Sequence, residues 1–416
     1  MTDSESLYNK LKSMGVQLGT DHLKAQQKKR SDDYGIEHVV QGEDLPTMYG
    51  MTFMTREVYP PEYQHGQICV CADPEMEVLS AWCGSTRITQ PGWRNVIFLD
   101  TETSGLMGGT GTYAFLVGLG YRTEEGFELI QLFMRDPGQE AAFLAALDQL
   151  LARFEVVVTF NGKTFDVPLL NTRYTMNGLP GPFGRYEHVD VLHIARKLWR
   201  DRLPSRALGD LEKEIVRFFR TGEDIPGWMI PQMYFDYLNN GDARPLSGIF
   251  YHNTRDILSL AALYGYIANM LYDPINQQEM YGLDLAAIAR LYEELGWIDK
   301  AADLYERSLD VGDLPELFFF KTMERYALLH RRQGNWQKAA QLWRKAAEHG
   351  EVSACIELAK YFEHQERNPM EALTWARKAL DNLQVNRYFS GSGQTQQREI
   401  ERRIGRLYQK VYSYRE

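Results

Sequence analysis

The sequence has no long apolar run. Hydrophobic residues make up 44% of the 416-residue chain, but no stretch approaches the roughly 18 consecutive apolar residues that a membrane-spanning helix needs. The first residues, MTDSESLYNKLKSMG, also lack the basic and then apolar segments of a secretory signal. We therefore expect a cytoplasmic protein with no membrane partner, long enough for two or three domains.

Cysteine and net positive charge are also scarce. The four cysteines are Cys69, Cys71, Cys83 and Cys355, and His65 is the one histidine close to the first three. A structural zinc site needs four ligands at suitable spacing, so buried reduced thiols are the favoured interpretation. The formal net charge of −10 argues against a uniformly basic surface, although a local basic groove is enough to bind nucleic acid.

Apolar patterns divide the chain into three parts. We expect residues 1–90 to form a polar arm and a small β-rich lead-in, 91–275 a mixed α/β domain, and 280–416 an all-α domain. In the middle part three antiparallel strands come first, and helices then alternate with strands. This order favours a ribonuclease-H-like mixed sheet over a simple doubly wound fold. The expected strands are 95–100, 113–121, 127–134, 155–160 and 188–192, and the expected helices are 138–154 and 165–178.

Paired helical segments recur after residue 280. Gly296 and Gly334 mark the expected turns of the first two pairs, and Arg367-Asn368-Pro369 marks the third. Alanines follow in each second helix, where a small side chain lets two helices approach. The period is roughly 34–38 residues, as in tetratricopeptide repeats. We favour such repeats over an irregular helical bundle.

Two carboxylates stand at the end of the first strand of the middle domain. Asp100 and Glu102 are two residues apart, so they project from the same face of a strand. Adjacent carboxylates repel unless a cation lies between them, and Mg²⁺ or Mn²⁺ prefers such oxygen ligands. Alone, this pattern is more typical of two solvated charges at a strand end.

Asp166 and Asp256 supply two further acids. Each is expected at the start of a helix, where the helix dipole favours a carboxylate, so each could be no more than a charge at a helix end. His252 lies one turn before Asp256 and faces the same side if the helix already covers it. The nearby Gly162-Lys163-Thr164 resembles the end of a phosphate-binding loop, but Val157 stands where that motif requires glycine.

In this order and on these elements, the acids resemble the DEDD exonuclease superfamily, with D-x-E on the first strand, an N-x-x-x-F-D segment and a late helical aspartate. Four longer segments are similar to the YprB-type family of bacterial proteins, in which this domain is also followed by tetratricopeptide-like repeats. The similarity covers about 95–275 by sequence and the C-terminal region by architecture. The segments are FLDTETSGLMGGTGTYAFLVGLG, FNGKTFDVPLLNTR, HVDVLHIARKLWR and YHNTRDILSL.

The resemblance implies a 3′→5′ exonuclease that hydrolyses phosphodiesters with two metal ions. Asp100, Glu102, Asp166 and Asp256 would bind two divalent cations, Mg²⁺ or Mn²⁺, whose charge balances the four carboxylates. One ion would activate a water, and the other would stabilise the departing 3′ oxygen. The resemblance also suggests DNA with a single-stranded 3′ end as the substrate, a role in DNA repair, and a helicase that binds the repeats.

The general base departs from the superfamily pattern. DEDD enzymes place a tyrosine four residues before the last aspartate or a histidine five before it, whereas here His252 is at minus four and Tyr251 at minus five. Histidine titrates near neutral pH and can take a proton directly from water. We therefore expect His252 to be the base, with Tyr251 as the alternative.

Substrate contacts are expected close to the acids. Gly108 and Gly109 belong to a glycine-rich loop that could admit the terminal nucleotide or could be a flexible connection. Thr101 and Asn161 adjoin the proposed ligands and are further candidates, although Asn161 could also simply shape its turn.

A basic segment, 194–209, is another candidate for contact with the substrate. Arg196 and Arg200 flank Trp199, and cations with an aromatic ring suit a single-stranded backbone and a stacked base. Residue by residue, a solvated helix face with Trp199 in the core is slightly favoured.

Two other functions compete with the DNA exonuclease. One is a ribonuclease that processes RNA 3′ ends, because no reader of the 2′-hydroxyl can be recognised in a sequence. The other is a non-catalytic repeat scaffold with a vestigial nuclease fold, against which the presence of all four acids counts.

Overall fold

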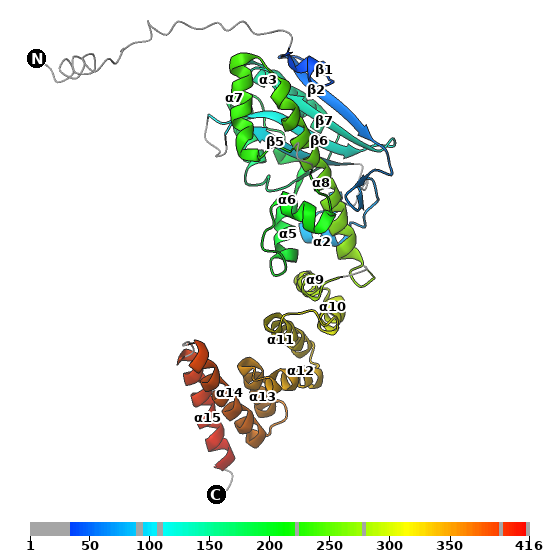
Figure 1. The fold of residues 1–416 in the computed structure, drawn as a ribbon. Coiled ribbons are helices and arrows are strands. Elements are labelled where there is room, and N and C mark those ends of the chain that lie inside the picture. Colours follow the sequence, from blue (N-terminus) through cyan, green and yellow to red (C-terminus); the bar gives the residue numbers. More distant parts are fainter. Residues whose placement is uncertain are drawn as a thin grey trace, which may run out of the picture.

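A mixed seven-stranded sheet forms the centre of the N-terminal half of the chain (Figure 1). The computed structural model describes residues 34–88, 95–105, 111–220, 224–276, 280–390 and 394–412. The strand order is β1-β2-β7-β6-β5-β8-β9, and β5 pairs antiparallel with β6 but parallel with β8. The strands are β1 (Glu43–Thr47), β2 (Gly50–Tyr59), β5 (Val96–Thr103), β6 (Ala114–Arg122), β7 (Phe127–Phe133), β8 (Val156–Thr159) and β9 (Glu187–Asp190), with β3 (Gln64–His65) and β4 (Ile68–Cys69) in a separate hairpin.

The sheet confirms the predicted mixed arrangement of three antiparallel strands followed by α/β units. It also extends beyond the boundary expected near residue 91, because β1 and β2 add two antiparallel strands along β7. The alternating pattern of residues 45–90 indicates strands, but it does not reveal which distant strand each one pairs with.

Helices cover both faces of the sheet. Alternate residues of β5 enter two separate cores: Ile97 and Leu99 pack with α3, α4 and α7, whereas Phe98 packs with α5 and α8. Burial on both faces explains why these strands read as continuous apolar runs. The helices of this half are α2 (Glu77–Cys83), α3 (Glu140–Leu151), α4 (Asp166–Met176), α5 (Val191–Trp199), α6 (Leu208–Leu211), α7 (Ile230–Asn240) and α8 (Ser247–Tyr272).

The C-terminal part is all-helical, as predicted, and its consecutive helices pack against one another in an arc below the sheet domain (Figure 1). Gly296 and Gly334 end the first helix of their pairs with φ of 78° and 80°. This left-handed conformation favours glycine. The helices are α9 (Gly282–Glu294), α10 (Ile298–Asp310), α11 (Glu316–Arg332), α12 (Trp336–Glu348), α13 (Val352–His364), α14 (Pro369–Ser390) and α15 (Gln394–Tyr412).

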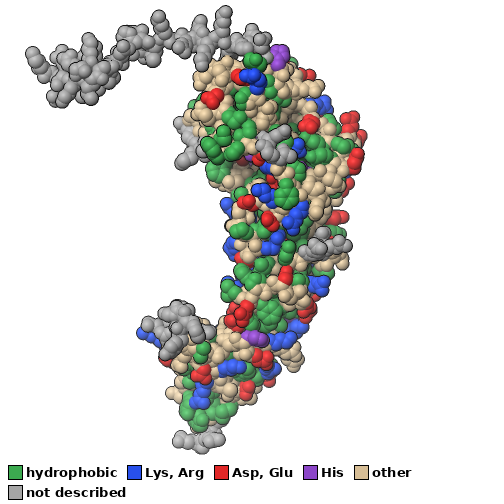
Figure 2. Space-filling view, in the orientation of Figure 1, with side chains coloured by type: hydrophobic (Ala, Val, Ile, Leu, Met, Phe, Trp, Pro, Cys, Tyr) green, Lys and Arg blue, Asp and Glu red, His purple; other side chains and the backbone are tan. Residues whose placement is uncertain are grey.

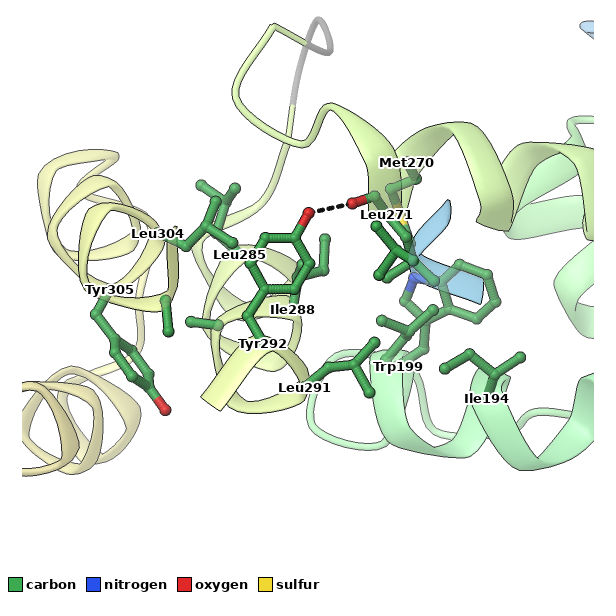
Figure 3. Packing of buried hydrophobic residues seen from close by; sticks show 14 of the residues in the cluster. Ile194, Trp199, Met270, Leu271, Leu285, Ile288, Leu291, Tyr292, Leu304 and Tyr305 are labelled. Atoms are coloured by element: carbon green, nitrogen blue, oxygen red, sulfur yellow. Dashed lines mark hydrogen bonds between the residues drawn. The ribbon is translucent and has the colours of Figure 1, made fainter. Parts of the chain in front are cut away.

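A shared apolar core joins the two parts. Figure 3 shows Trp199 of α5 and Leu271 of α8 beside Leu291 and Tyr292 of α9, and the Tyr292 hydroxyl donates a hydrogen bond to the Leu271 carbonyl. An ion pair of 2.8 Å between Arg202 and the buried Asp284 also crosses this junction. The helical arc is therefore packed directly on the sheet domain. Within the described part of the chain, no helix is both long and apolar enough to cross a membrane.

Candidate metal centre

Asp100 and Glu102 continue the face of β5 that Phe98 presents to α8. They lie two and four residues beyond Phe98 on the same strand, so their side chains leave the sheet on that side. Asp100 is held there by the buried Asn253 of α8, whose Nδ2 donates to its Oδ2 over 3.0 Å. The predicted pair of carboxylates therefore faces the helix that carries Asp256.

Asp166 joins this group from the first residue of α4, as predicted. The Thr101 hydroxyl donates to its Oδ1 over 2.5 Å. The turn before α4 depends on Asn161, which has a φ of 65°, and on Asp190, which accepts hydrogen bonds from the backbone N–H groups of Asn161 and Lys163. Asn161 therefore shapes the turn that positions Asp166, and a substrate contact by its side chain stays a prediction.

Asp256 and His252 are neighbours on α8. The helix begins at Ser247, so Asp256 lies well inside it rather than at its start, which corrects the expectation that this residue leads the helix. The same fact places His252 on the helix, with its Nε2 3.5 Å from Asp256 Oδ2. One ligand atom each from Glu102, His252 and Asp256 lie within 4.8 Å of one another, a spacing that could hold a metal ion.

The carboxyl groups of the site interact strongly. Burial, and then the charges of Asp256 and Asp166, raise the pKa of Asp100 well above its ordinary value. Burial, and then the charges of Asp100, Asp256 and Asp166, also raise the pKa of Glu102 well above its ordinary value. Burial raises the pKa of Asp166 to about 6, although the Thr101 hydrogen bond opposes the shift. The four predicted acids, which are far apart in the chain, are thus brought within electrostatic reach of one another.

Arg220 and Asp224 also belong to the site, although sequence reasoning missed them. Arg220 pairs with Asp256, with Glu212 over 2.7 Å and with Asp224 over 3.3 Å. Asp224 lies 2.7 Å from His252 Nδ1. Both residues stand in an irregular segment without a repeating pattern, so no local signal distinguishes them. Asn253 was missed as well, although it follows His252 directly.

The two candidate bases point to different places. His252 lines the cleft that also contains Asp256, whereas Tyr251 lines a separate cavity, where the Arg255 guanidinium lies 4.6 Å from its ring centre. The geometry favours His252.

Five other residues predicted to contact the substrate have different outcomes. Trp199 is fully buried in the core between the two parts of the chain (Figure 3), so the prediction that it stacks on a base is wrong and the core interpretation holds. Arg196 and Arg200 are exposed. Arg200 lines a hollow shared with α9 and α11 rather than the cleft at His252. Gly108 and Gly109 lie outside the described residues.

The cysteines do not form a metal site in the described part of the chain. All four are free thiols, and no cluster of zinc-type ligands includes any of them. His65 instead lies 2.7 Å from the Ser259 hydroxyl, in the core. Cys71 and Cys355 are buried, whereas Cys69 and Cys83 are partly exposed.

Comparisons with known proteins now place the chain in a family. It is 32% identical over 347 residues to the uncharacterized protein YprB of Bacillus subtilis (strain 168), a match that covers 79% of this chain and 80% of that protein. This chain belongs to the YprB family. The profile of the RNase H superfamily matches residues 97–268, which contain all four acids. The central domain is therefore an RNase H-like nuclease domain, of a superfamily that hydrolyses phosphodiester bonds with divalent metal ions.

A solved structure also matches part of the chain. It is the family B DNA polymerase of the hyperthermophilic archaeon Pyrobaculum calidifontis, with 16% sequence identity and a TM-score of 0.32. The match covers 47% of this chain and 28% of the polymerase chain.

The residues of the site fit divalent cations. Four carboxylates converge there, and Arg220, which pairs with Asp256, is shared with Glu212 and Asp224. No described side chain donates a hydrogen bond to Glu102, and the charge of Arg220 only partly offsets the burial and the three neighbouring acids that raise its pKa. Oxygen-rich, negatively charged sites of this kind suit Mg²⁺ or Mn²⁺.

Proposed function

We propose that the chain is a metal-dependent 3′→5′ exonuclease that acts on DNA. The observation that carries this proposal is the meeting of Asp100, Glu102, Asp166 and Asp256. Burial raises the pKa of the first three, and repulsion by the other acids raises it further for Asp100 and Glu102. Such a site is unfavourable without cations. These four residues would hold two divalent ions, which when bound supply an activated water and stabilise the departing 3′ oxygen.

His252 would take the proton of the attacking water on Nε2. Its Nδ1 lies 2.7 Å from Asp224, which fixes the ring with Nε2 directed at Asp256. Asn253 holds Asp100 at the other side of the group. It is itself fixed by Gln131, whose Nε2 donates to its Oδ1 over 3.0 Å. These second contacts set the orientation of the groups that bind ions or move protons.

We further propose that the helical region is a set of tetratricopeptide-like repeats that bind a protein partner. Its antiparallel pairs, glycine turns and buried alanines such as Ala301 and Ala339 support this assignment. A role in DNA repair, a helicase as the partner and a cytoplasmic location complete the proposal. Co-purification of the helical region with a helicase is the corresponding test.

Digestion of labelled strands tests the proposed activity. Single- and double-stranded DNA and RNA, labelled at the 5′ or the 3′ end, are incubated with and without Mg²⁺ or Mn²⁺. We expect a ladder of shortened products from 5′-labelled single-stranded DNA and release of mononucleotide from 3′-labelled DNA, only with the ion. Faster digestion of RNA would instead support a ribonuclease, and no digestion of any strand would support a scaffold.

A further inference from the structure

The cleft beside the proposed metal centre has a volume of about 460 Å³. Asp256 and His252 form part of its wall, so any group bound there lies next to the reacting phosphate. The remaining wall comes from α6, the π-helix Glu212–Val216 and the segment that leads to α7. Phe219 and Lys213 also line this cleft, and neither takes part in the chemistry proposed above.

Phe219 is exposed although both of its neighbours are anchored. Its side chain is 68% exposed. The ring of Phe218 stacks on that of the buried His65, with ring centres 4.0 Å apart, and Arg220 pairs with Glu212 and Asp256. The position of Phe219 at the cleft is therefore set by contacts on each side of it, rather than by a loose loop.

The π-helix before it carries a buried and an exposed side chain on adjacent residues, and both line the cleft. Glu212 is buried and accepts hydrogen bonds from Arg220 and Ser259, whereas Lys213 is exposed and lines the cleft. The π-helix ends at Val216, the following Arg217 has a φ of 60°, and Val216 accepts a backbone hydrogen bond of 3.0 Å from Gln67. Such uncommon backbone is retained where it positions functional side chains.

We propose that Phe219 and Lys213 form a nucleotide subsite that selects an unpaired strand end. Phe219 stacks on the base of one of the last three nucleotides, and Lys213 binds a phosphate of the same strand. An exposed aromatic ring offers a base a flat apolar face, which every base can use. Lys213 has no ion-pair partner among the described residues, so its charge is available to phosphate. A base within a duplex is covered on both faces, so this subsite favours single-stranded ends; the inference rests on the proposed exonuclease function.

Affinities of the parent and of Phe219 variants for intact and abasic strands test the stacking contact in the full-length chain. Fluorescence anisotropy would measure the affinity for single-stranded DNA with Ca²⁺ in place of Mg²⁺, using an intact strand and strands with one abasic position among the last three. The variants are Phe219→Ala, Phe219→Trp and, as a matched control, Tyr49→Ala. Tyr49 is 48% exposed in the turn between β1 and β2, on the edge of the sheet away from β5.

We expect the parent to lose roughly tenfold in affinity when one particular position is abasic. Phe219→Ala should lose the same factor on the intact strand and should no longer distinguish that abasic strand. Phe219→Trp and Tyr49→Ala should behave like the parent. Affinity falls as salt rises, so the slope of log affinity against log salt is negative. For Lys213→Ala this slope should become shallower by about 0.7, the value for one phosphate contact on a single strand.

Two results would overturn the subsite. One is a Phe219→Ala variant that discriminates against the abasic strands as the parent does, and the other is a parent that discriminates at none of the three positions. Both require that the parent binds and digests strands, so they leave the exonuclease proposal standing. A parent that neither binds nor digests any strand would reject the exonuclease proposal and, with it, the subsite.

Discussion

The nuclease domain and the helical arc each bury acidic side chains, but they surround them with different neighbours. In the arc, Glu363 has a side chain only 1% exposed and lies within 3 Å of Arg403, Arg406 and Lys410. These cations outweigh its burial and lower the pKa of Glu363 to about 2. In the nuclease domain the neighbours of Asp100 and Glu102 are mainly other carboxylates, and burial and repulsion raise both pKa values.

On the proposed function, the difference separates a charge that stabilises the fold from charges that bind metal ions. Glu363 is balanced within the chain, and it fastens α15 to α13 without any other component. The acids at the end of β5 lack such a balance, so their burial is favourable only when cations are added from solution.

The largest effect is expected for Asp100→Asn. Loss of a ligand charge should reduce metal-dependent digestion on the order of a thousandfold or more, measured as initial rates on 5′-labelled single-stranded DNA. The melting temperature without metal should not fall, because the substitution relieves repulsion with Asp166 and Asp256.

Glu140→Gln is the matched control for this variant. Glu140 is buried but is paired internally with Arg173 over 2.6 Å. Its substitution should lower the melting temperature while the digestion rate of the folded protein is kept. If Asp100→Asn digested DNA at the parent rate, the assignment of the metal centre would be wrong.

In contrast to Asp100→Asn, Glu363→Gln should lower the stability of the protein. It leaves three cations without their shared carboxylate, and because two of them are about half exposed, the cost should be roughly 2 kcal/mol in the free energy of unfolding. Since the pKa of Glu363 is lowered, the parent should hold this stability above pH of about 4.5 and lose it as the pH falls towards about 2. Urea denaturation measures both effects.

Glu348 of α12 is exposed. Its substitution, Glu348→Gln, controls for the simple loss of one negative charge and should change the stability little. A Glu363→Gln variant as stable as this control would show that the cluster contributes nothing.

Without metal ions, the stability of the nuclease domain should fall as the pH rises, whereas the stability that Glu363 contributes falls as the pH drops. Because the pKa of Asp166 is raised to about 6, its contribution to stability is complete at low pH and is lost as the pH rises through that value. Mg²⁺ or Mn²⁺ should therefore stabilise the protein more at pH 8 than at pH 5, by on the order of 1 kcal/mol. Melting temperatures with and without the ion at both pH values test this, and an equal shift at the two pH values would contradict it.

Local sequence patterns predicted the parts of the site that lie on regular elements. Asp100 and Glu102 share a face because strands alternate, and Asp166 follows β8 at the start of a helix. Arg220 and Asp224 could not be predicted, since they reach the site from an irregular segment through tertiary contacts alone.

The same limit applies to the fold. The pairing of β2 with β7 joins residues more than 60 positions apart, and no local pattern specifies such a partner. Trp199 was ambiguous for a related reason. An amphipathic helix shows which face is apolar, but the helical arc that covers that face becomes visible only in the structure.

A much smaller loss of activity than that of Asp100→Asn is expected for Thr101→Val, which removes one contact of one carboxylate. The Thr101 hydroxyl lowers the pKa of Asp166 against the effect of burial, so its loss should raise that pKa further. A hydrogen bond to a charged group contributes about 1.5 kcal/mol, so kcat/KM at neutral pH should fall roughly tenfold, with the acidic limb of the pH–rate profile moved upward. Thr101→Ser should restore both, and a valine variant with the parent profile would show that the contact is without effect.

The corresponding change in the arc is Lys410→Met, which removes one of several cations around Glu363. Because two arginines remain on that carboxylate, stability should fall by less than in Glu363→Gln. A site with surplus partners tolerates the loss of one, whereas in the nuclease domain the Thr101 hydroxyl and Asn253 are among the few donors that hold the acids. Equal sensitivity of the two sites to these single-contact changes would remove the distinction between them.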